Sequence, residues 1–262
     1  MKAQKIITTA QYPLAAALVV NMYQEYDCFA YFYNKYWTIN APLYLETALD
    51  ILLLEKLPEN AHILDVCCGT GNVAGLLSER GYSITGLDGS SLMLDYAKEN
   101  AKAAEFIQAD ARDFHLGRKF HAVTCLFDSI NHLLEKDDVL QVFKNIYEHL
   151  EENGIFVFDV NSLSSSKDVD LSDFSAVEEN EVFISQGTYN SIEKLITYSL
   201  TAFIKEDNKW ERYDNKIYER YYEEKLLISL LKKAGFINTA YTYGADIGIE
   251  PFEDRVFFTA WK

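Results

Sequence analysis

Short apolar runs alternate with amphipathic segments along the middle of the chain. The apolar runs predict strands at 62–67, 83–88, 105–110, 121–127 and 155–160. The segments between them have helical spacing, at 72–80, 90–104 and 137–154. Gly154 is placed to end the last of these helices. Short buried strands that alternate with helices are typical of a parallel sheet covered on both faces.

The flanking parts of the chain follow other patterns. Two helices are expected ahead of the first strand, at 26–37 and 41–58. After a loop rich in serine and aspartate at 162–175, residues 181–222 alternate in polarity like antiparallel strands. One face of this part is formed by Ile196, Tyr198, Leu200, Ala202 and Ile204. The chain then closes with a helix that stops near Gly235 and with two strands, at 239–243 and 255–261.

These elements predict an α/β fold with a doubly wound, mostly parallel sheet of seven strands. N-terminal helices and an inserted antiparallel β-sheet are expected to be added to it. The main domain would comprise residues 1–162 and 223–262. Residues 163–222 would form the insertion and cover a substrate pocket.

The composition narrows the choice of partners. The 262 residues include 40 acidic and 24 basic side chains, which give a formal net charge of −16 without a basic cluster. Nucleic acid is therefore a poor candidate, since each phosphate contact needs a cation. The cysteines, at 28, 67, 68 and 125, show no metal-ligand spacing and suit a reducing cytoplasm.

An apolar stretch near the start, PLAAALVV at 13–20, follows Lys2 and Lys5 as the centre of a secretory signal would. Polar residues interrupt it and no small-residue cleavage site follows, so a short buried helix is the favoured interpretation. Nothing in the sequence approaches the ~20 continuous apolar residues that span a bilayer. We therefore expect a cytoplasmic protein without a membrane partner.

The segment ILDVCCGTGNVAGLL, at 63–77, has the pattern of a strand, a glycine turn and a helix. Gly69 and Gly71 allow the backbone to approach a ligand closely and to direct free amide groups at it. This signal is weak by itself, because many such junctions hold two glycines. Asp65 makes it more specific, since a carboxylate here would repel a pyrophosphate and favour an ammonium or sulfonium group. The simpler interpretation of Asp65 is a helix-capping carboxylate.

Two further acids follow at the ends of the next two strands. Asp88 lies 17 residues past Gly71, where a carboxylate can accept both hydroxyls of a ribose. Asp110 is suited to an adenine amino group. Ligands of such sheets bind along the edge that these strand ends share. The series favours a binding site over helix capping by Asp65 and predicts a cationic ligand with a ribose and an adenine.

These segments resemble the class I S-adenosylmethionine-dependent methyltransferases. LDVCCGTGN resembles the family's glycine motif, and GLDGSSLMLDYAKE resembles its ribose segment. FIQADARDF resembles the adenine segment, and RKFHAVTCLFDSINHLL the fourth strand with the loop that meets the substrate. The resemblance covers most of the chain and is closest to small-molecule members similar to the aminosugar N-methyltransferases, which also insert antiparallel strands. It implies a Rossmann-like fold, S-adenosylmethionine as cofactor and S-adenosylhomocysteine as product.

Carried over by position, the resemblance implies which residues bind the cofactor. Near the methionine moiety it places Asp65, the Gly69 backbone and Leu126. Around the ribose and the adenine it places Asp88, Met93, Asp110 and Ala111. The same motifs add Cys67, Gly71 and Gly89, and two tyrosines from the N-terminal helices would close over the cofactor, Tyr26 and Tyr33. Cys67 departs from the usual Gly or Ala, although a small side chain still fits there.

Methyl transfer from a sulfonium is an in-line displacement with an activated leaving group, so the protein mainly aligns the nucleophile and excludes water. No metal is required. An amine nucleophile must be deprotonated, and we predict that Asp128 and His132, with Asp159 behind them, take its proton. The alternative for His132 is a structural or solvated histidine. Aromatic residues of the insertion are candidates for the pocket wall, namely Tyr189, Tyr198, Trp210, Tyr213, Tyr218 and Tyr221.

The favoured function is therefore methyl transfer to a small-molecule acceptor. An NAD-dependent oxidoreductase would use the same kind of turn, but the charge of Asp65 argues against it. A non-catalytic module that binds S-adenosylmethionine is a third hypothesis. The negative charge disfavours a tRNA acceptor, and the acidic run at 176–181 is expected to be a solvated surface. The oligomeric state is left open.

Overall fold

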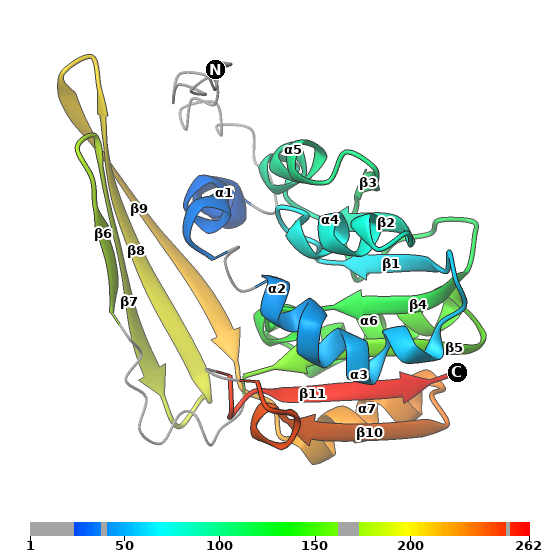
Figure 1. Cartoon of the computed structure of the whole chain (residues 1–262). Coiled ribbons are helices and arrows are strands. Elements are labelled where there is room, and N and C mark those ends of the chain that lie inside the picture. Colours follow the sequence, from blue (N-terminus) through cyan, green and yellow to red (C-terminus); the bar gives the residue numbers. More distant parts are fainter. Residues whose placement is uncertain (1–23, 38–40, 162–172, 250–251) are drawn as a thin grey trace.

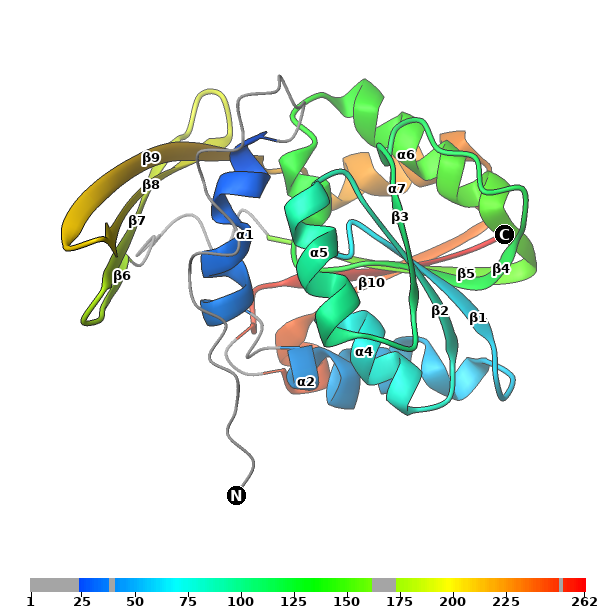
Figure 2. The same cartoon turned by 90° about the horizontal axis from the view of Figure 1, so that it is seen from above.

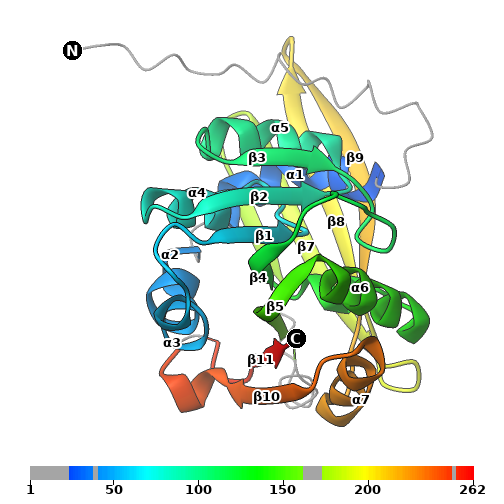
Figure 3. The ribbon, with the colours of Figure 1, turned by 90° about the vertical axis from the view of Figure 1, so that its right-hand side faces the viewer.

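The computed structural model describes residues 24–37, 41–161, 173–249 and 252–262. Its main sheet has seven strands in the order β10-β11-β5-β4-β1-β2-β3 (Figure 3). The parallel strands are β1 (His62–Val66), β2 (Ser83–Asp88), β3 (Glu105–Gln108), β4 (Phe120–Cys125) and β5 (Leu150–Val160). The last strand in the sequence, β11 (Val256–Trp261), runs antiparallel to both of its neighbours, β5 and β10 (Asn238–Tyr243).

Helices cover both faces of this sheet (Figure 3). The face with α4 (Asn72–Glu79) also carries the broken helical segment before β1, which comprises α2 (Ala41–Leu43), a π-helical turn at Tyr44–Leu49, α3 (Asp50–Leu52) and a 3₁₀ turn at Leu54–Lys56. The opposite face carries α6 (Lys136–His149) and α7 (Glu224–Ala234), which ends at Gly235 as expected. The predicted doubly wound, mostly parallel α/β fold is therefore confirmed.

Two helix ends differ from the prediction. The helix α5 (Ser91–Asn100) stops four residues before the expected position 104. The expectation that Gly154 ends α6 is wrong, because the helix stops at His149 and Leu150 already pairs with Phe120 in the sheet. The Nζ group of Lys262 donates to the carbonyl oxygens of Tyr147 and Leu150, at 2.7 and 3.0 Å. The end of the helix is thus fixed by β5 and by the last residue of the chain, which local sequence does not reveal.

The predicted inserted strands form a separate antiparallel sheet beside the main one (Figure 1). Its strands are β6 (Phe174–Val177), β7 (Glu181–Asn190), β8 (Leu195–Glu206) and β9 (Lys209–Arg220). Strand β6 was not expected, since its residues fall at the end of the predicted serine-rich loop and the start of the acidic run. Most of that loop lies outside the described residues, as does the stretch at 13–20. On β8, the predicted inward face is buried at Ile196, Leu200, Ala202 and Ile204.

Helix α1 (Gln24–Tyr36) lies between the inserted sheet and α5 (Figure 2). Its ring of Phe32 stacks on Phe183 of β7, with ring centroids 4.4 Å apart. On the other side, the Ser90 hydroxyl donates to Asp27 at 2.5 Å, while the same hydroxyl accepts the Met93 amide at the start of α5. The helix therefore connects the inserted sheet to the main domain.

The acidic run at 176–181 does not form a purely solvated surface, in contrast to the expectation. Glu181 is buried and accepts hydrogen bonds from the Tyr31 hydroxyl at 2.6 Å and the Lys35 ammonium at 2.5 Å. Lys35 also pairs with Glu178 at 2.7 Å. Glu181 thus provides a polar attachment between β7 and α1, since its carboxylate can accept several bonds at once.

Helices long and apolar enough to cross a membrane are absent from the part of the chain that the structure describes.

We expect Glu181→Ala to lower the free energy of unfolding by about 2 kcal/mol, because it removes charge-assisted hydrogen bonds from a buried site. Urea denaturation followed by circular dichroism would measure this change. The exposed neighbour Glu179, changed to alanine, is the matched control and should leave the free energy nearly unchanged. Equal stability of the two variants would contradict the assigned role of Glu181.

Candidate active site

The turn between β1 and α4 uses three residues with a left-handed backbone. Cys67, Gly69 and Gly71 have φ values of 57, 53 and 74°. At Gly71 a side chain is also excluded by space, since a Cβ would lie 2.8 Å from the Cβ of Ala97. The conformation of Cys67 costs roughly 1–2 kcal/mol for a residue other than glycine. This backbone requirement explains why glycine suits position 67, which the sequence alone did not show.

Two acids flank this turn, Asp65, which is buried, and Asp88, which is half-buried. Asp65 is 3% exposed and accepts a hydrogen bond from the Thr124 hydroxyl at 2.6 Å. Burial raises the pKa of Asp65 to about 7, with a further upward contribution from Asp88 and a downward one from Thr124. Asp88 accepts the backbone N–H groups of Gly69 at 2.8 Å and Ser90 at 2.9 Å, and burial raises its pKa as well. A cationic ligand would relieve the charge of this pair.

A pocket opens at the end of β1 and β4. Of the predicted cofactor residues, it is lined by Tyr33, Asp65, Cys67 and Leu126. The other lining residues are Ala41, Cys68, Thr70, Asn72, Val73 and Phe127. The ring of Tyr33 lies against the turn, with Cε1 3.3 Å from the place a Cβ of residue 69 would take. Tyr33 therefore covers the turn, and a ligand must enter beside its ring or displace it.

The remaining predicted cofactor residues lie around this pocket but do not line it. The carboxylate of Asp110 is held by Arg112, whose Nη2 is 2.7 Å from Oδ2. Met93 is buried in the apolar cluster of α1 and the inserted sheet. The carbonyl oxygens of Gly89 and Ala111 accept side-chain amides of Gln108 and Asn145. An adenine amino group at Asp110 would thus have to share the carboxylate with Arg112.

The turn after β4 is held by Asp159, at the end of β5. Its two carboxylate oxygens accept the backbone N–H groups of Phe127 at 2.7 Å and Asp128 at 3.0 Å. Phe127 and Asp128 both have positive φ, 57 and 52°. Arg255 donates through Nη1 to Asp128 at 2.8 Å and also to Asp159. Burial raises the pKa of Asp159 and Arg255 opposes this effect, so these contacts make Asp159 a positioning group.

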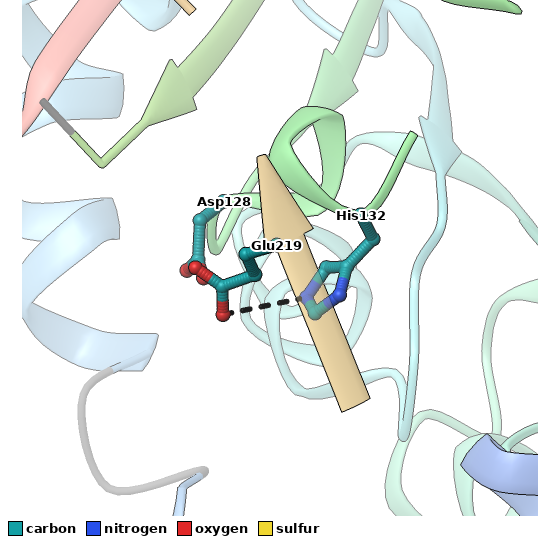
Figure 4. Close-up of side chains that lie close together, drawn as sticks. All are labelled: Asp128, His132 and Glu219. Atoms are coloured by element: carbon teal, nitrogen blue, oxygen red, sulfur yellow. Dashed lines mark ion pairs between the residues drawn. The ribbon is translucent and has the colours of Figure 1, made fainter. Parts of the chain in front are cut away.

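Asp128 and His132 lie together with a third residue, Glu219 of β9 (Figure 4). Donor atoms of the three side chains lie within 4.8 Å of one another. The side-chain amide of Asn161 donates to both Asp128 and Glu219, and His132 Nε2 is 3.9 Å from Glu219 Oε1. The sequence predicted the first two residues of this acid–histidine cluster but not the third.

A signal for Glu219 exists in the sequence. Along β9, the residues that face inward alternate with exposed ones, and Ile217 and Glu219 both fall on the buried face. A charged residue at a position where the alternation predicts an apolar side chain is costly, and such residues often serve function. The same reasoning would have drawn attention to Arg255, just before β11.

The aromatic residues divide into two groups. The ring of Tyr26 meets His132 edge-on at 5.6 Å, so Tyr26 belongs to the acid–histidine cluster rather than to the glycine turn. Tyr198 is near the cluster as well, since burial and then Glu219 and Asp128 raise its pKa. Trp210 and Tyr218 are 48% and 39% exposed, so they do not wall a pocket as expected.

A sheet of this order, with a glycine turn after β1 and acids near the ends of β1, β2 and β3, is typical of the class I S-adenosylmethionine-dependent methyltransferases. Residues 63–154 match the family described as "Methyltransferase domain". A protein of Geobacillus sp. (strain WCH70) that is named as a methyltransferase is 34% identical to this chain over 251 residues. The match covers 90% of this chain and 99% of that protein. The chain therefore belongs to this methyltransferase family, and S-adenosylmethionine is its cofactor.

Two further similarities are more distant. A dTDP-3-amino-3,4,6-trideoxy-alpha-D-glucopyranose N,N-dimethyltransferase of Streptomyces venezuelae is 34% identical over 127 residues, which cover 48% of this chain and 54% of that enzyme. The crystal structure of an S-adenosylmethionine-dependent methyltransferase from Clostridium acetobutylicum ATCC 824 has a TM-score of 0.72 at 24% identity. The superposition covers 90% of this chain and 98% of the Clostridium chain, and this similarity supports the assignment of the fold.

The residues present fit this cofactor. The pair of buried Asp65 and half-buried Asp88 suits its positive charge, and Gly69 itself adds no side chain to the turn. Although Asp88 already accepts two amides, a carboxylate has about four acceptor positions, so it can also receive ribose hydroxyls.

Cofactor affinity should rise with pH. With a pKa of about 7, Asp65 is largely neutral at about pH 6 and largely ionised at about pH 8, and only the ionised form attracts a cation. We expect calorimetry to show S-adenosylmethionine binding about tenfold more tightly at the higher pH. Asp65→Asn should bind weakly at both pH values, whereas exposed Asp95→Asn should behave like the wild type. An unchanged pH dependence in Asp65→Asn would exclude this role.

Proposed function

We propose that this methyltransferase transfers the methyl group to the nitrogen of a small-molecule amine. The observation that carries the proposal is the acid–histidine cluster, in which Asp128 and His132 are half-buried and Glu219 is buried. It follows directly on Leu126 and Phe127, which line the cofactor pocket. An amine that reaches the cofactor beside Leu126 would thus meet groups that can bind its cationic form and accept its proton.

The cofactor supplies an activated methyl group, whose bond to sulfur breaks with the electron pair left on sulfur as the new N–C bond forms. The chain's own residues have simpler tasks. Asp128 would attract the ammonium group, and Tyr26 and Tyr198 would offer aromatic surface, which favours cations. His132, beside Glu219, would pass the proton toward solvent.

The similarity to the Streptomyces venezuelae enzyme supports an amine acceptor, because its printed substrate is a 3-amino sugar nucleotide. The match covers 48% of this chain, so the acceptor is inferred from the acid–histidine cluster itself. A cytoplasmic location is part of the proposal, in keeping with the free thiols of Cys67, Cys68 and Cys125. We also propose that residues 163–222 act as the acceptor-covering domain.

The test is transfer of a labelled methyl group to a panel of small primary amines, including dTDP-3-amino-3,4,6-trideoxy-alpha-D-glucopyranose, each paired with its hydroxyl analogue. We expect label on amines only. Asp128→Asn should lower kcat/KM by about 100-fold, since an acid that binds or deprotonates the nucleophile contributes this much. Exposed Asp137→Asn is the control and should leave kcat/KM unchanged. Label on hydroxyl members alone, or on no member, would refute the proposal.

A further inference from the structure

Glu219 is the most unusual residue of the inserted sheet. It is 5% exposed and lies on the face of β9 that is otherwise occupied by residues such as Ile217. Removing an ionised carboxylate from water is costly unless partners compensate for the lost hydration. Leucine or isoleucine would satisfy the packing of this position, so the acid needs another explanation.

The partners of Glu219 come from the main domain. The Asn161 side-chain amide donates to Glu219 Oε2 at 3.0 Å and to Asp128 Oδ2 at 3.1 Å. Side-chain oxygens of Asp128 and Glu219 also lie within 4.8 Å of each other. Two carboxyl groups this close repel each other when both are ionised, which favours a single proton shared between them.

The surrounding charges decide which carboxyl group holds this proton. Burial opposes ionisation of Asp128, but Arg255 and then His132 outweigh it and lower the pKa of Asp128. Burial and the charge of Asp128 raise the pKa of Glu219, and the more distant Arg255 compensates only in part. Glu219 therefore holds a proton more tightly than Asp128 does.

The charges of the cluster indicate the charge of a ligand that would bind there. If Asp128, Asp159 and Glu219 were all ionised while His132 was neutral, Arg255 would balance only one of three negative charges. A monovalent cation placed between Asp128 and Glu219 would replace their shared proton. A divalent ion fits less well, because it would lie close to the guanidinium that already pairs with Asp128.

We infer that Glu219 forms, with Asp128, the binding site for the ammonium group of the acceptor, and that Glu219 accepts the proton that the acceptor loses before methyl transfer. This inference rests on the proposed function. On binding, the shared proton leaves to solvent. One N–H bond of the ammonium group then breaks, an O–H bond forms on Glu219, and the nitrogen keeps the electron pair that attacks the methyl carbon. The proton returns to solvent by way of His132.

The position of Glu219 is fixed by bonds around it. The Asn131 amide donates to the carbonyl of Arg220 at 2.9 Å, and Arg220 Nε donates to the carbonyl of Leu134 at 2.5 Å. The Tyr222 hydroxyl donates to the carbonyl of Leu133. These bonds join the end of β9 to the loop after β4. The inserted sheet thereby supplies a reactive group and is more than a cover.

The experiment compares Glu219→Gln with Glu211→Gln, an exposed position on the same strand. The substrate is the amine of the panel with the highest kcat/KM, and kcat and KM of each variant are measured with it across pH. The ionisable groups that face Glu219 are Asp128, His132, Tyr198 and Arg255, with Asp159 behind them. We expect Glu219→Gln to lower kcat about 100-fold, as loss of a general base does, and to remove the acid limb of the pH profile. Glu211→Gln should match the wild type.

Binding gives a second readout that needs no turnover. Calorimetry of the same amine with the S-adenosylhomocysteine complex, in two buffers of different ionisation enthalpy, counts the protons released. Below the pKa of Glu219 the wild type should release about one proton per amine bound, and Glu219→Gln should release none. The affinity of Glu219→Gln for S-adenosylhomocysteine should stay at the wild-type value, because Glu219 does not line the cofactor pocket.

If Glu219→Gln does not fold, Asn161→Ala serves instead. Asn161 lowers the pKa of Glu219, so its removal should move the acid limb to higher pH.

Amine methylation that is equal in wild type and Glu219→Gln, or an unmoved limb in Asn161→Ala, overturns this inference and leaves the proposed function standing. Activity that is lost with a chelator and restored by a divalent ion overturns it in favour of a metal site. Absence of any amine methylation by the wild type overturns both.

Discussion

The bonds of the Asp159 carboxylate to the turn after β4 determine the geometry of the whole site. Two consecutive residues, Phe127 and Asp128, have a strained backbone with positive φ, and the two hydrogen bonds to their amides offset this strain. Asp159 is fully buried, and Arg255 from the neighbouring strand segment compensates its charge. The turn directs Leu126 and Phe127 to the cofactor pocket and Asp128 to the acid–histidine cluster. One buried ion pair therefore fixes the spacing between the two ligands.

The parts that enclose the site are attached by buried polar contacts at defined points. Asp27 joins α1 to the start of α5, Glu181 joins α1 to β7, and Asn161 joins Glu219 to Asp128. Apolar packing, such as the stack of Phe32 on Phe183, adds buried apolar surface but tolerates small shifts in register. Hydrogen bonds of this kind tolerate much less, because a shift leaves a buried acid without a partner. The inserted sheet and α1 are thus held where Glu219 meets Asp128.

The sequence was most informative where local periodicity and tertiary structure agree. The parallel strands, the glycine turn and the acids at 65 and 88 followed from alternation and position. The end of α6 did not, because β5 and Lys262 fix it from outside the segment. The backbone at Cys67, Phe127 and Asp128 has positive φ although none of them is a glycine, so residue type did not reveal this strain. The partner of Asp128 was missed because a sequence does not show which strand of an insertion returns to the site.

The charges of the two binding sites follow from the reaction they enclose. Asp65 and Leu126 line the cofactor pocket, and Asp128, two residues after Leu126, lies with Glu219 in the acid–histidine cluster. Two cationic ligands at this distance repel each other in a site of low dielectric constant. Transfer of one proton from the acceptor to Glu219 removes that repulsion and creates the nucleophile in the same step. Asp128 stays ionised beside Arg255 and is available to the positive charge that the methylated nitrogen acquires. A carboxyl pair with unequal proton affinities therefore suits an amine acceptor better than a neutral hydroxyl, which brings no charge for the pair to bind.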